Sequence, residues 1–180
     1  MTTKLALDSE TNQDFFKNFF ESIPLSLIVV NANDEIIYLN SFTEKLFGYH
    51  REELLKKSID ILIPNRYRKK HAANYSNYFK KPEVKLMGKG RELFALKKNL
   101  SEFPVEIGLS PLTYNNDTFV IASIIDISSR KESEKVIRDN RNKLQLILDN
   151  SPDSIIVYDI KGNIIQKNKE SELNFFKNKT

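Results

Sequence analysis

An internal repeat constrains the fold of this 180-residue chain more than any other feature. IPLSLIVVNANDEIIYLN, which begins at Ile23, aligns without a gap with SPDSIIVYDIKGNIIQKN, which begins at Ser151. The residues that match in this single register are Pro24/Pro152, Ser26/Ser154, Ile28/Ile156, Val29/Val157, Ile36/Ile164, Ile37/Ile165, Asn40/Asn168, Glu44/Glu172 and Phe47/Phe175. Because polar residues and proline match as well as apolar ones, the repeat predicts two copies of one unit, a fragment of a tandem array.

Only the first copy is followed by enough sequence to complete a hydrophobic core. Its expected elements are a helix over Asp14–Ser22, strands over Leu27–Val30 and Ile36–Leu39, a helix capped by Ser41 that ends near Gly48, a helical turn over Arg51–Lys56, a helix from Pro64 to about Phe79, and strands over Phe103–Leu109 and Thr118–Ile125. Strands at both ends with helices between them predict an antiparallel α+β fold. The second copy stops about thirty residues in, so we expect it to be frayed or only partly ordered.

Composition excludes several classes of protein. The net charge of +4 comes from 28 basic and 24 acidic residues that are interspersed, whereas a nucleic-acid surface needs a basic stripe with stacking aromatics. The absence of cysteine excludes disulfides and thiolate metal sites and is compatible with a reducing cytosol. No apolar run is long enough to span a membrane, and the N-terminus does not resemble a secretion signal. We therefore expect a cytoplasmic protein.

Two apolar patterns face each other in the expected fold. The helix that follows Pro64 carries an inward stripe of Tyr67, His71, Tyr75, Tyr78 and Phe79 at helical spacing. The strand through Phe103, Val105, Ile107 and Leu109 alternates apolar and other residues, as half-buried strands do. From these patterns we expect the side chains of Tyr67, Tyr75, Phe103, Val105 and Ile107 to point into the interior.

Three segments resemble PAS domains. NSFTEKLFGY from Asn40, followed by REEL from Arg51, is similar to the signature helix region of that family. FPVEI from Phe103 and DISSRK from Asp126 are similar to its later strands and its exit motif. The resemblance implies a PAS fold, a five-stranded antiparallel sheet with helices over one face that enclose a small-molecule pocket. In such a fold the pocket would be lined by Tyr67, Tyr75, Phe103, Val105 and Ile107. The expected parts are a flexible tail over 1–13, the PAS domain over 14–128, a connector helix over 129–150 and an incomplete second PAS repeat over 151–180.

The exit motif predicts a relay. Asp126 ends the last strand, where its carboxylate can cap the outgoing helix, and Arg130 lies within reach to pair with it. Ile137 and Leu144 lie one heptad apart in the connector, which is compatible with helix pairing but too short to define a coiled coil. We expect a homodimer through the N-terminal and connector helices, with a plain solvated linker helix as the alternative.

His71 is the sharpest candidate for a cofactor ligand. The region from Pro64 to His71, followed by Met87-Gly-Lys-Gly-Arg91, resembles the haem-binding PAS domains of oxygen-sensing kinases. This resemblance implies that His71 is an axial iron ligand, that Arg91 contacts bound oxygen or a propionate, and that Leu86 and Leu109 lie over the distal face. Sensor-kinase PAS domains with no known haem share the same block, and Asn77 stands where the haem family has a basic residue. A hydrogen-bonded core histidine is therefore the alternative.

The chain carries no Ser-x-x-Lys or His-Glu-x-x-His motif and no cysteine for a flavin adduct. We therefore expect a non-enzymatic sensory module that binds a small ligand or partner and passes a conformational change into the helix after Asp126. Any catalytic output would belong to a missing domain or to a partner such as a histidine kinase or cyclase. The alternatives are a haem gas sensor and a ligand-free protein–protein docking domain with a filled core.

Overall fold

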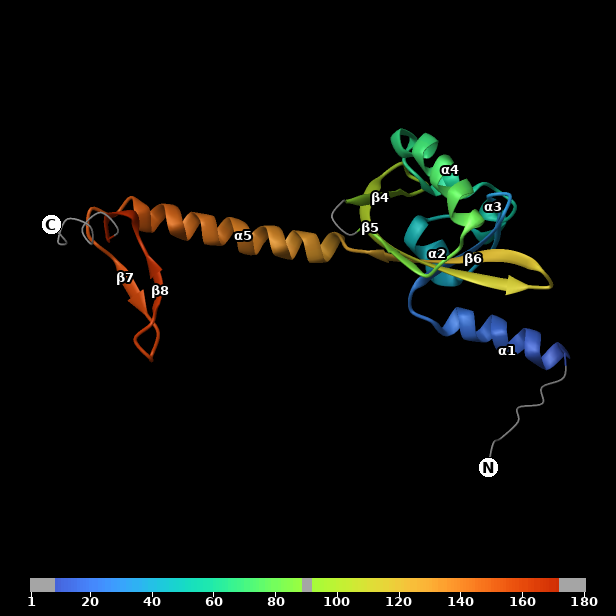
Figure 1. Cartoon of the computed structure of the whole chain (residues 1–180), viewed down its shortest axis with the longest axis horizontal. Helices are drawn as coiled ribbons and strands as arrows, with labels where there is room; N and C mark the ends of the chain where they lie inside the picture. Colours follow the sequence, from blue (N-terminus) through green and yellow to red (C-terminus); the bar gives the residue numbers. More distant parts are fainter. Residues whose placement is uncertain (1–8, 89–91, 172–180) are drawn as a thin grey trace, which may run out of the picture. The chain divides into compact units, whose positions relative to one another are not determined.

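The computed structural model describes residues 9–88 and 92–171, which belong to two compact units, 1–128 and 129–180 (Figure 1). The first unit contains α1 (Ser9–Ser22), β1 (Ser26–Asn31), β2 (Ile36–Leu39), α2 (Ser41–Phe47), α3 (Arg51–Leu54), the 3-10 helix η1 (Ile59–Leu62), α4 (Asn65–Lys80), β3 (Lys85–Met87), β4 (Leu93–Leu96), β5 (Glu102–Tyr114) and β6 (Asp117–Asp126). The second contains α5 (Ser128–Asp149), β7 (Ile156–Tyr158) and β8 (Ile164–Lys167). None of the helices within these described ranges is long and apolar enough to cross a bilayer.

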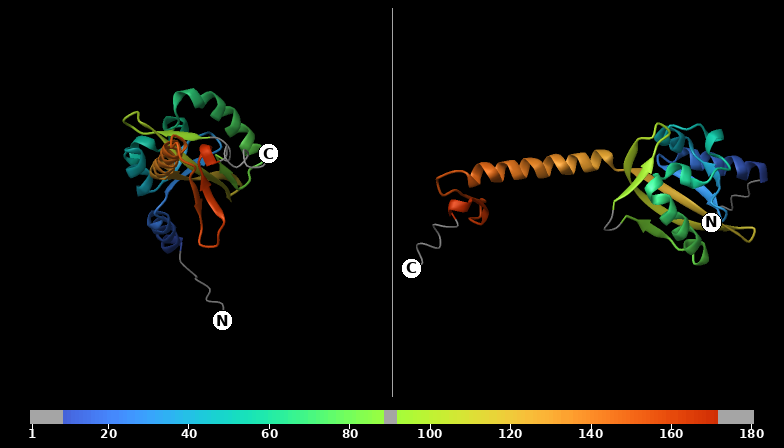
Figure 2. Two further views of the ribbon diagram at one scale, coloured as in Figure 1. Left: turned by 90° about the vertical axis from the view of Figure 1, so that its left-hand side faces the viewer. Right: turned by 90° about the horizontal axis from the view of Figure 1, so that it is seen from above.

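The first unit is built on one antiparallel sheet with the strand order β2-β1-β6-β5-β3, in which β4 also pairs with β5. Strand β3 pairs with residues 107–109 of β5 and β4 pairs with residues 102–105, so these two short strands together occupy one edge of the sheet. Helices α2, α3 and α4 lie on one side of the sheet, which we call the inner face (Figures 1 and 2). The predicted fold class is confirmed. The sheet has five strand positions, and β3 and β4 share the one beside β5.

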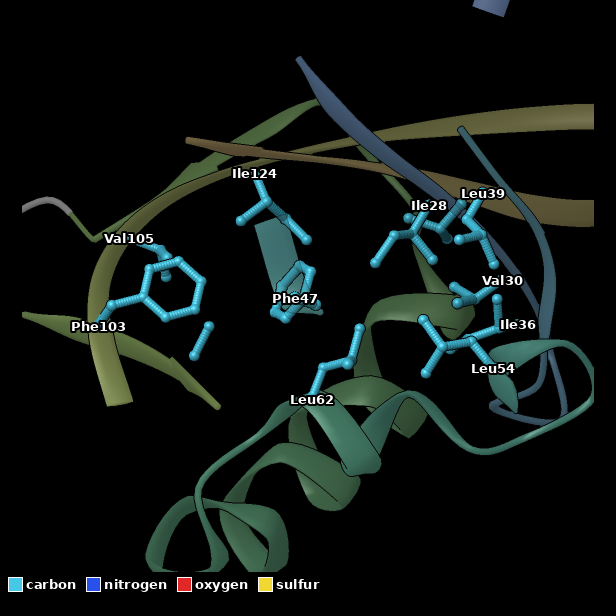
Figure 3. Packing of buried hydrophobic residues seen from close by; sticks show 12 residues of the cluster. Ile28, Val30, Ile36, Leu39, Phe47, Leu54, Leu62, Phe103, Val105 and Ile124 are labelled. Atoms are coloured by element: carbon cyan, nitrogen blue, oxygen red, sulfur yellow. The ribbon is translucent and has the colours of Figure 1, made fainter. Parts of the chain in front are cut away.

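The hydrophobic core lies between the inner face and these helices. Its buried members are Ile28, Val30, Ile36, Leu39, Phe47, Leu54, Leu62, Ala95, Phe103, Val105, Val120 and Ile124. Figure 3 shows Phe47 of α2 pointing toward the sheet residues Phe103, Val105 and Ile124. The rings of Phe47 and Phe103 meet edge to face with centroids 5.6 Å apart, so α2 packs directly onto β5.

Most of the predicted elements are present. The Asn115–Asn116 turn joins β5 to β6 with positive φ at both residues, as type I′ hairpins require. Gly48 caps α2 in the left-handed conformation, with a φ of 76°. The N-cap prediction is wrong by one position, because Asn40 rather than Ser41 caps α2. The local sequence pattern did not predict η1, β3 and β4, because segments of three or four residues carry too little periodicity.

The second unit repeats the first hairpin. Strands β7 and β8 pair antiparallel with a register shift between Val157 and Tyr158, at the positions that match the shift between Val29 and Val30 in β1. Residues 156–167 therefore form a hairpin, and the expectation that the second copy is frayed or only partly ordered stays a prediction. The matched residues Glu172 and Phe175 lie outside the described residues.

Candidate functional site

The candidate site is a polar cluster of Asp34, Asp60 and His71, contributed by three different elements of the first unit. Asp34 lies in the turn between β1 and β2, Asp60 lies in η1, and His71 lies in α4. The Nδ1 of His71 is 2.8 Å from Oδ1 of Asp60, and both side chains are 28% exposed. One potential ligand atom from each of the three residues lies within 4.8 Å of the others. The cluster is therefore compact, partly buried and open to solvent on one side.

Asp34 has the least satisfied side chain of the cluster. Its Oδ2 accepts a hydrogen bond from the Ser58 hydroxyl. Its Oδ1 is buried, and no donor in the described part of the chain reaches it. Burial raises the pKa of the Asp34 carboxyl, and the nearby charge of Asp60 raises it further, while the Ser58 hydrogen bond and His71 oppose the shift. Asp34 also adopts a left-handed backbone conformation with a φ of 67°, which asparagine and aspartate tolerate better than most residues.

Tyr75 extends the cluster by one turn of α4. Its hydroxyl donates a hydrogen bond to the carbonyl of Asn31, so α4 is held against the end of β1. Burial raises the pKa of Tyr75, and the negative charge of Asp34 adds to this. Its ring packs against Phe79, with centroids 4.8 Å apart, and lies 5.8 Å from the His71 ring. Tyr75 therefore joins the polar cluster to the apolar side of α4.

The predicted pocket residues separate into three groups. Phe103 and Val105 are buried in the core, whereas Ile107 and Leu109 are half-buried on the inner face, and Tyr75 packs against the same core from α4. Tyr67 is 37% exposed and lies beneath the Arg66 guanidinium, 4.5 Å from the ring centroid, and its place in a pocket stays a prediction. The α4 stripe that contacts the core therefore begins later in the helix, and it includes Tyr78 and Phe79.

Leu86 and Leu109 lie on opposite faces of the sheet. Leu86 pairs with Gly108, whose neighbour on β6 is Ser123, whereas Met87 pairs with Ile107, whose neighbour is Ile124 of the core. Because directly opposed residues share a face, Leu86 lies on the outer face of the sheet and Met87 on the inner face. Leu86 is 70% exposed there, on the face of the sheet opposite to the core. Arg91, predicted as the distal arginine, lies outside the described residues.

The predicted relay begins where β6 ends. The Asp126 carboxylate accepts a hydrogen bond of 2.8 Å from the backbone N–H of Ser128, the first residue of α5. The N–H of Ile127 donates to the carbonyl of Pro104 in β5. The chain therefore remains bonded to the sheet until α5 starts. Arg130 lies 3.8 Å from Glu134 within α5, and its pairing with Asp126 stays a prediction.

Asn40 is the most highly connected polar residue of the first unit. Its side chain is fully buried, and its Oδ1 accepts hydrogen bonds from the N–H groups of Leu27 (3.1 Å) and Thr43 (3.1 Å). Its Nδ2 donates to the carbonyls of Phe20 (3.1 Å) and Leu25 (2.8 Å). One side chain therefore joins the end of α1, the start of β1 and the start of α2. We call this set of bonds the Asn40 network.

Asn168 repeats this arrangement in the second unit. Its Oδ1 accepts from the N–H groups of Ile155 (2.9 Å) and Ser171 (3.1 Å), and its Nδ2 donates to the carbonyls of Leu148 (3.0 Å) and Asp153 (2.8 Å). Each partner occupies the position in the repeat that the corresponding partner of Asn40 occupies in the first copy. In this Asn168 network, the end of α5 takes the place of the end of α1.

The two units also share a carboxylate at the end of the helix that precedes the hairpin. In the first unit Glu21 of α1 accepts from the N–H of Ser41 at 2.8 Å. In the second unit Asp149 of α5 accepts from the N–H of Lys169 at 2.9 Å. Sequence matching identified the asparagines only as repeated residues. Their roles were missed because the backbone groups that they bond are up to 20 residues away in the sequence.

Comparison with known proteins identifies relatives for most of the chain. Residues 24–129 match the PAS domain family. The oxygen sensor protein DosP of Escherichia coli (strain K12) is 28% identical over 145 residues, which cover 81% of this chain and 18% of that protein. Sporulation kinase A of Bacillus subtilis (strain 168) is 29% identical over 149 residues, which cover 80% of this chain and 23% of that protein. The chain thus spans less than a quarter of either relative.

Solved structures agree on the fold. The PAS domain of a two-component sensor histidine kinase superposes with a TM-score of 0.56 at 16% identity, covering 66% of this chain and 99% of that one. The match extends over almost all of that isolated domain. The first unit therefore has the architecture of a whole domain of this kind.

Proposed function

Because this chain belongs to the PAS domain family, we propose that it is a sensory relay module whose output passes through α5. A small ligand or a partner protein that binds one packing of the sheet and helices better than another would shift the population of the two states. The relatives named as a sensor and as a kinase support a role in signalling. We further propose that the module acts in the cytoplasm, and that catalysis lies on a downstream histidine kinase or cyclase, in the same protein or in a partner.

The Asn168 network is the observation that carries this proposal. Helix α5 has 22 residues, about 33 Å of helix at 1.5 Å per residue. Its first turn follows the Asp126 cap at the end of β6, and its last turn is bonded to Asn168 through the Leu148 carbonyl. In this proposal, a change at the end of β6 alters the start of α5 and is passed along the helix to the Asn168 network.

Asn168→Ala is expected to separate this hairpin from α5. The substitution removes the acceptor of the Ile155 N–H and the donor to the Leu148 carbonyl. We expect amide hydrogen exchange at Ile155 and in the last turn of α5 to accelerate at least about tenfold, because each lost bond contributes on the order of 1 kcal/mol. Exchange in the first unit should not change. Asn140→Ala, at an exposed position of α5, is the matched control. Unchanged exchange at Ile155 would contradict the relay.

We also propose that the module forms a homodimer through α1 and α5. Helix α1 exposes three phenylalanines, Phe15 (51%), Phe16 (58%) and Phe19 (52%). Helix α5 has no buried residue in the structure and exposes Ile137 and Leu144, the pair one heptad apart. Half-exposed phenylalanines that are adjacent on one helix are uncommon on a monomeric surface and favour a partner helix.

A second candidate function, haem-based gas sensing, is favoured by the contact between His71 and Asp60. When the Asp60 carboxylate accepts a hydrogen bond from Nδ1–H of His71, the tautomer of the imidazole is fixed and Nε2 is left to bind a metal. This arrangement is usual for histidines that bind metals. The likeness to a protein named as an oxygen sensor supports the same candidate. His71 and the inward-facing Leu109 fit a haem, whereas the outward-facing Leu86 does not. Haem would supply an iron that binds a diatomic gas.

The haem candidate predicts a Soret band when the full chain is produced with haem available. His71→Ala should abolish the band, because it removes the proposed axial ligand, while His50→Ala should leave it unchanged. An absorption spectrum of the purified protein measures both outcomes. No Soret band, or one that survives His71→Ala, rejects haem and leaves the relay proposal intact.

A further inference from the structure

We propose that Asp34, Asp60 and His71 bind a divalent transition metal ion of the Zn²⁺ type. The three side chains come from a turn, a 3-10 helix and α4, and each offers one ligand atom within 4.8 Å of the other two. One imidazole nitrogen and two carboxylate oxygens form a ligand set that Zn²⁺ accepts, with water in a fourth position. This inference goes beyond the relay and does not depend on it.

The orphaned oxygen of Asp34 is the observation that points to a cation. Burial has removed water from Oδ1, and no donor from the described residues replaces it. A buried acceptor without a partner costs about 1–3 kcal/mol, and more when it is charged. The charges that act on this carboxyl are those of Asp60 and His71, so a second carboxylate increases the deficit. A bound cation would satisfy Oδ1 and neutralise the repulsion between the two carboxylates.

The ligand chemistry selects the class of ion. Ca²⁺ takes six to eight oxygen ligands and Mg²⁺ retains most of its waters, so neither uses an imidazole in preference to oxygen. Imidazole together with carboxylate suits Zn²⁺ and its transition-metal neighbours. All three residues are partly exposed, which leaves room for water or a small anion as the remaining ligand.

Binding would change how three elements are held together. The present contacts are pairwise, with Ser58 on Asp34 and His71 on Asp60. A shared ion would replace the direct bond between His71 and Asp60 and would join the β1–β2 turn, η1 and α4 at one point. The ion and a haem both need His71, so the two occupants exclude each other.

Isothermal titration calorimetry tests the site. The full chain is first stripped of metal with EDTA and is then titrated with ZnCl₂. We expect one equivalent of Zn²⁺ to bind and Ca²⁺ and Mg²⁺ to bind far more weakly. Asp34→Asn, which preserves shape, should weaken Zn²⁺ affinity by about tenfold or more, and His71→Ala should abolish binding. His50→Ala removes the other histidine and should have no effect.

Thermal unfolding distinguishes a variant that has lost Zn²⁺ binding from one that has failed to fold. Zn²⁺ should raise the melting temperature of the parent and of His50→Ala, because a ligand that binds the native state stabilises it by mass action. Asp34→Asn should remain folded, as judged by circular dichroism, yet lose most of this increase. The proposal is overturned if Zn²⁺ does not bind, if binding is lost with His50, or if folded Asp34→Asn binds Zn²⁺ as the parent does.

Discussion

Replacement of Asn40 by alanine is expected to destabilise the first unit by about 3–5 kcal/mol, enough to unfold a marginally stable domain. The side chain is fully buried, and its loss would leave the N–H of Leu27 and the carbonyls of Phe20 and Leu25 without a partner. Each buried group left unsatisfied costs about 1–3 kcal/mol, and the methyl group of alanine replaces none of the lost bonds.

Urea unfolding followed by circular dichroism measures this effect as a lower midpoint. Asn33→Ala, at an exposed turn position nearby, should change stability by less than about 0.5 kcal/mol. If Asn40→Ala destabilised the protein no more than Asn33→Ala does, the Asn40 network would not hold α1, β1 and α2 together. The inferred role of Asn168 would then lose its basis as well.

Phe16→Asp is expected to weaken the proposed homodimer by about a thousandfold. A symmetric interface contains the substituted residue twice, and loss of a buried aromatic contact costs about 2 kcal/mol or more. The rings of Phe15 and Phe19 stack with centroids 6.4 Å apart, and Phe16 contacts Phe15 at 5.8 Å. An aspartate in this aromatic group would introduce a charge that a paired helix cannot solvate.

Sedimentation velocity over a range of concentrations measures this change in the full chain. Ile160→Asp makes a comparable chemical change at a fully exposed position of the second unit and should leave the dimer intact. Phe16 is 58% exposed, so its replacement should not unfold α1, which circular dichroism can verify. A parent chain that sediments only as a monomer at high concentration would reject the dimer, whereas equal dissociation by both variants would reject α1 as its interface.

The fold could be predicted because its signals are local. Alternation at Phe103 and Val105 identified a half-buried strand, and the Asn-Asn turn before Asp117 identified the following hairpin. Gly48 marked the end of a helix because only glycine adopts the left-handed conformation without strain. Where the signal was weaker the predictions failed. Both Asn40 and Ser41 are good caps, and only the folded chain shows that Asn40 is the one that bonds Thr43.

The site was harder to predict because its parts are distant in sequence. His71 was identified from its place on a helix, but its partners Asp34 and Asp60 had no spacing that related them to it. The faces of short strands were equally uncertain. A three-residue strand has no measurable period, so the face of the sheet that Leu86 occupies could not be predicted. Pairing with β5 places Met87 on the inner face.

The sequence by itself determined the repeat, the order of helices and strands, the family and the absence of thiol chemistry, because these depend on composition and on contacts between near neighbours. Only the tertiary structure decided which side of the sheet Leu86 occupies, that Asp34 and Asp60 meet His71, and that the repeated asparagines hold helix ends. Strand pairing and helix docking join residues that are tens of positions apart, and no local pattern encodes their register. The repeat that begins at Ile23 and again at Ser151 thus acquires its physical meaning in the bonds of Asn40 and Asn168.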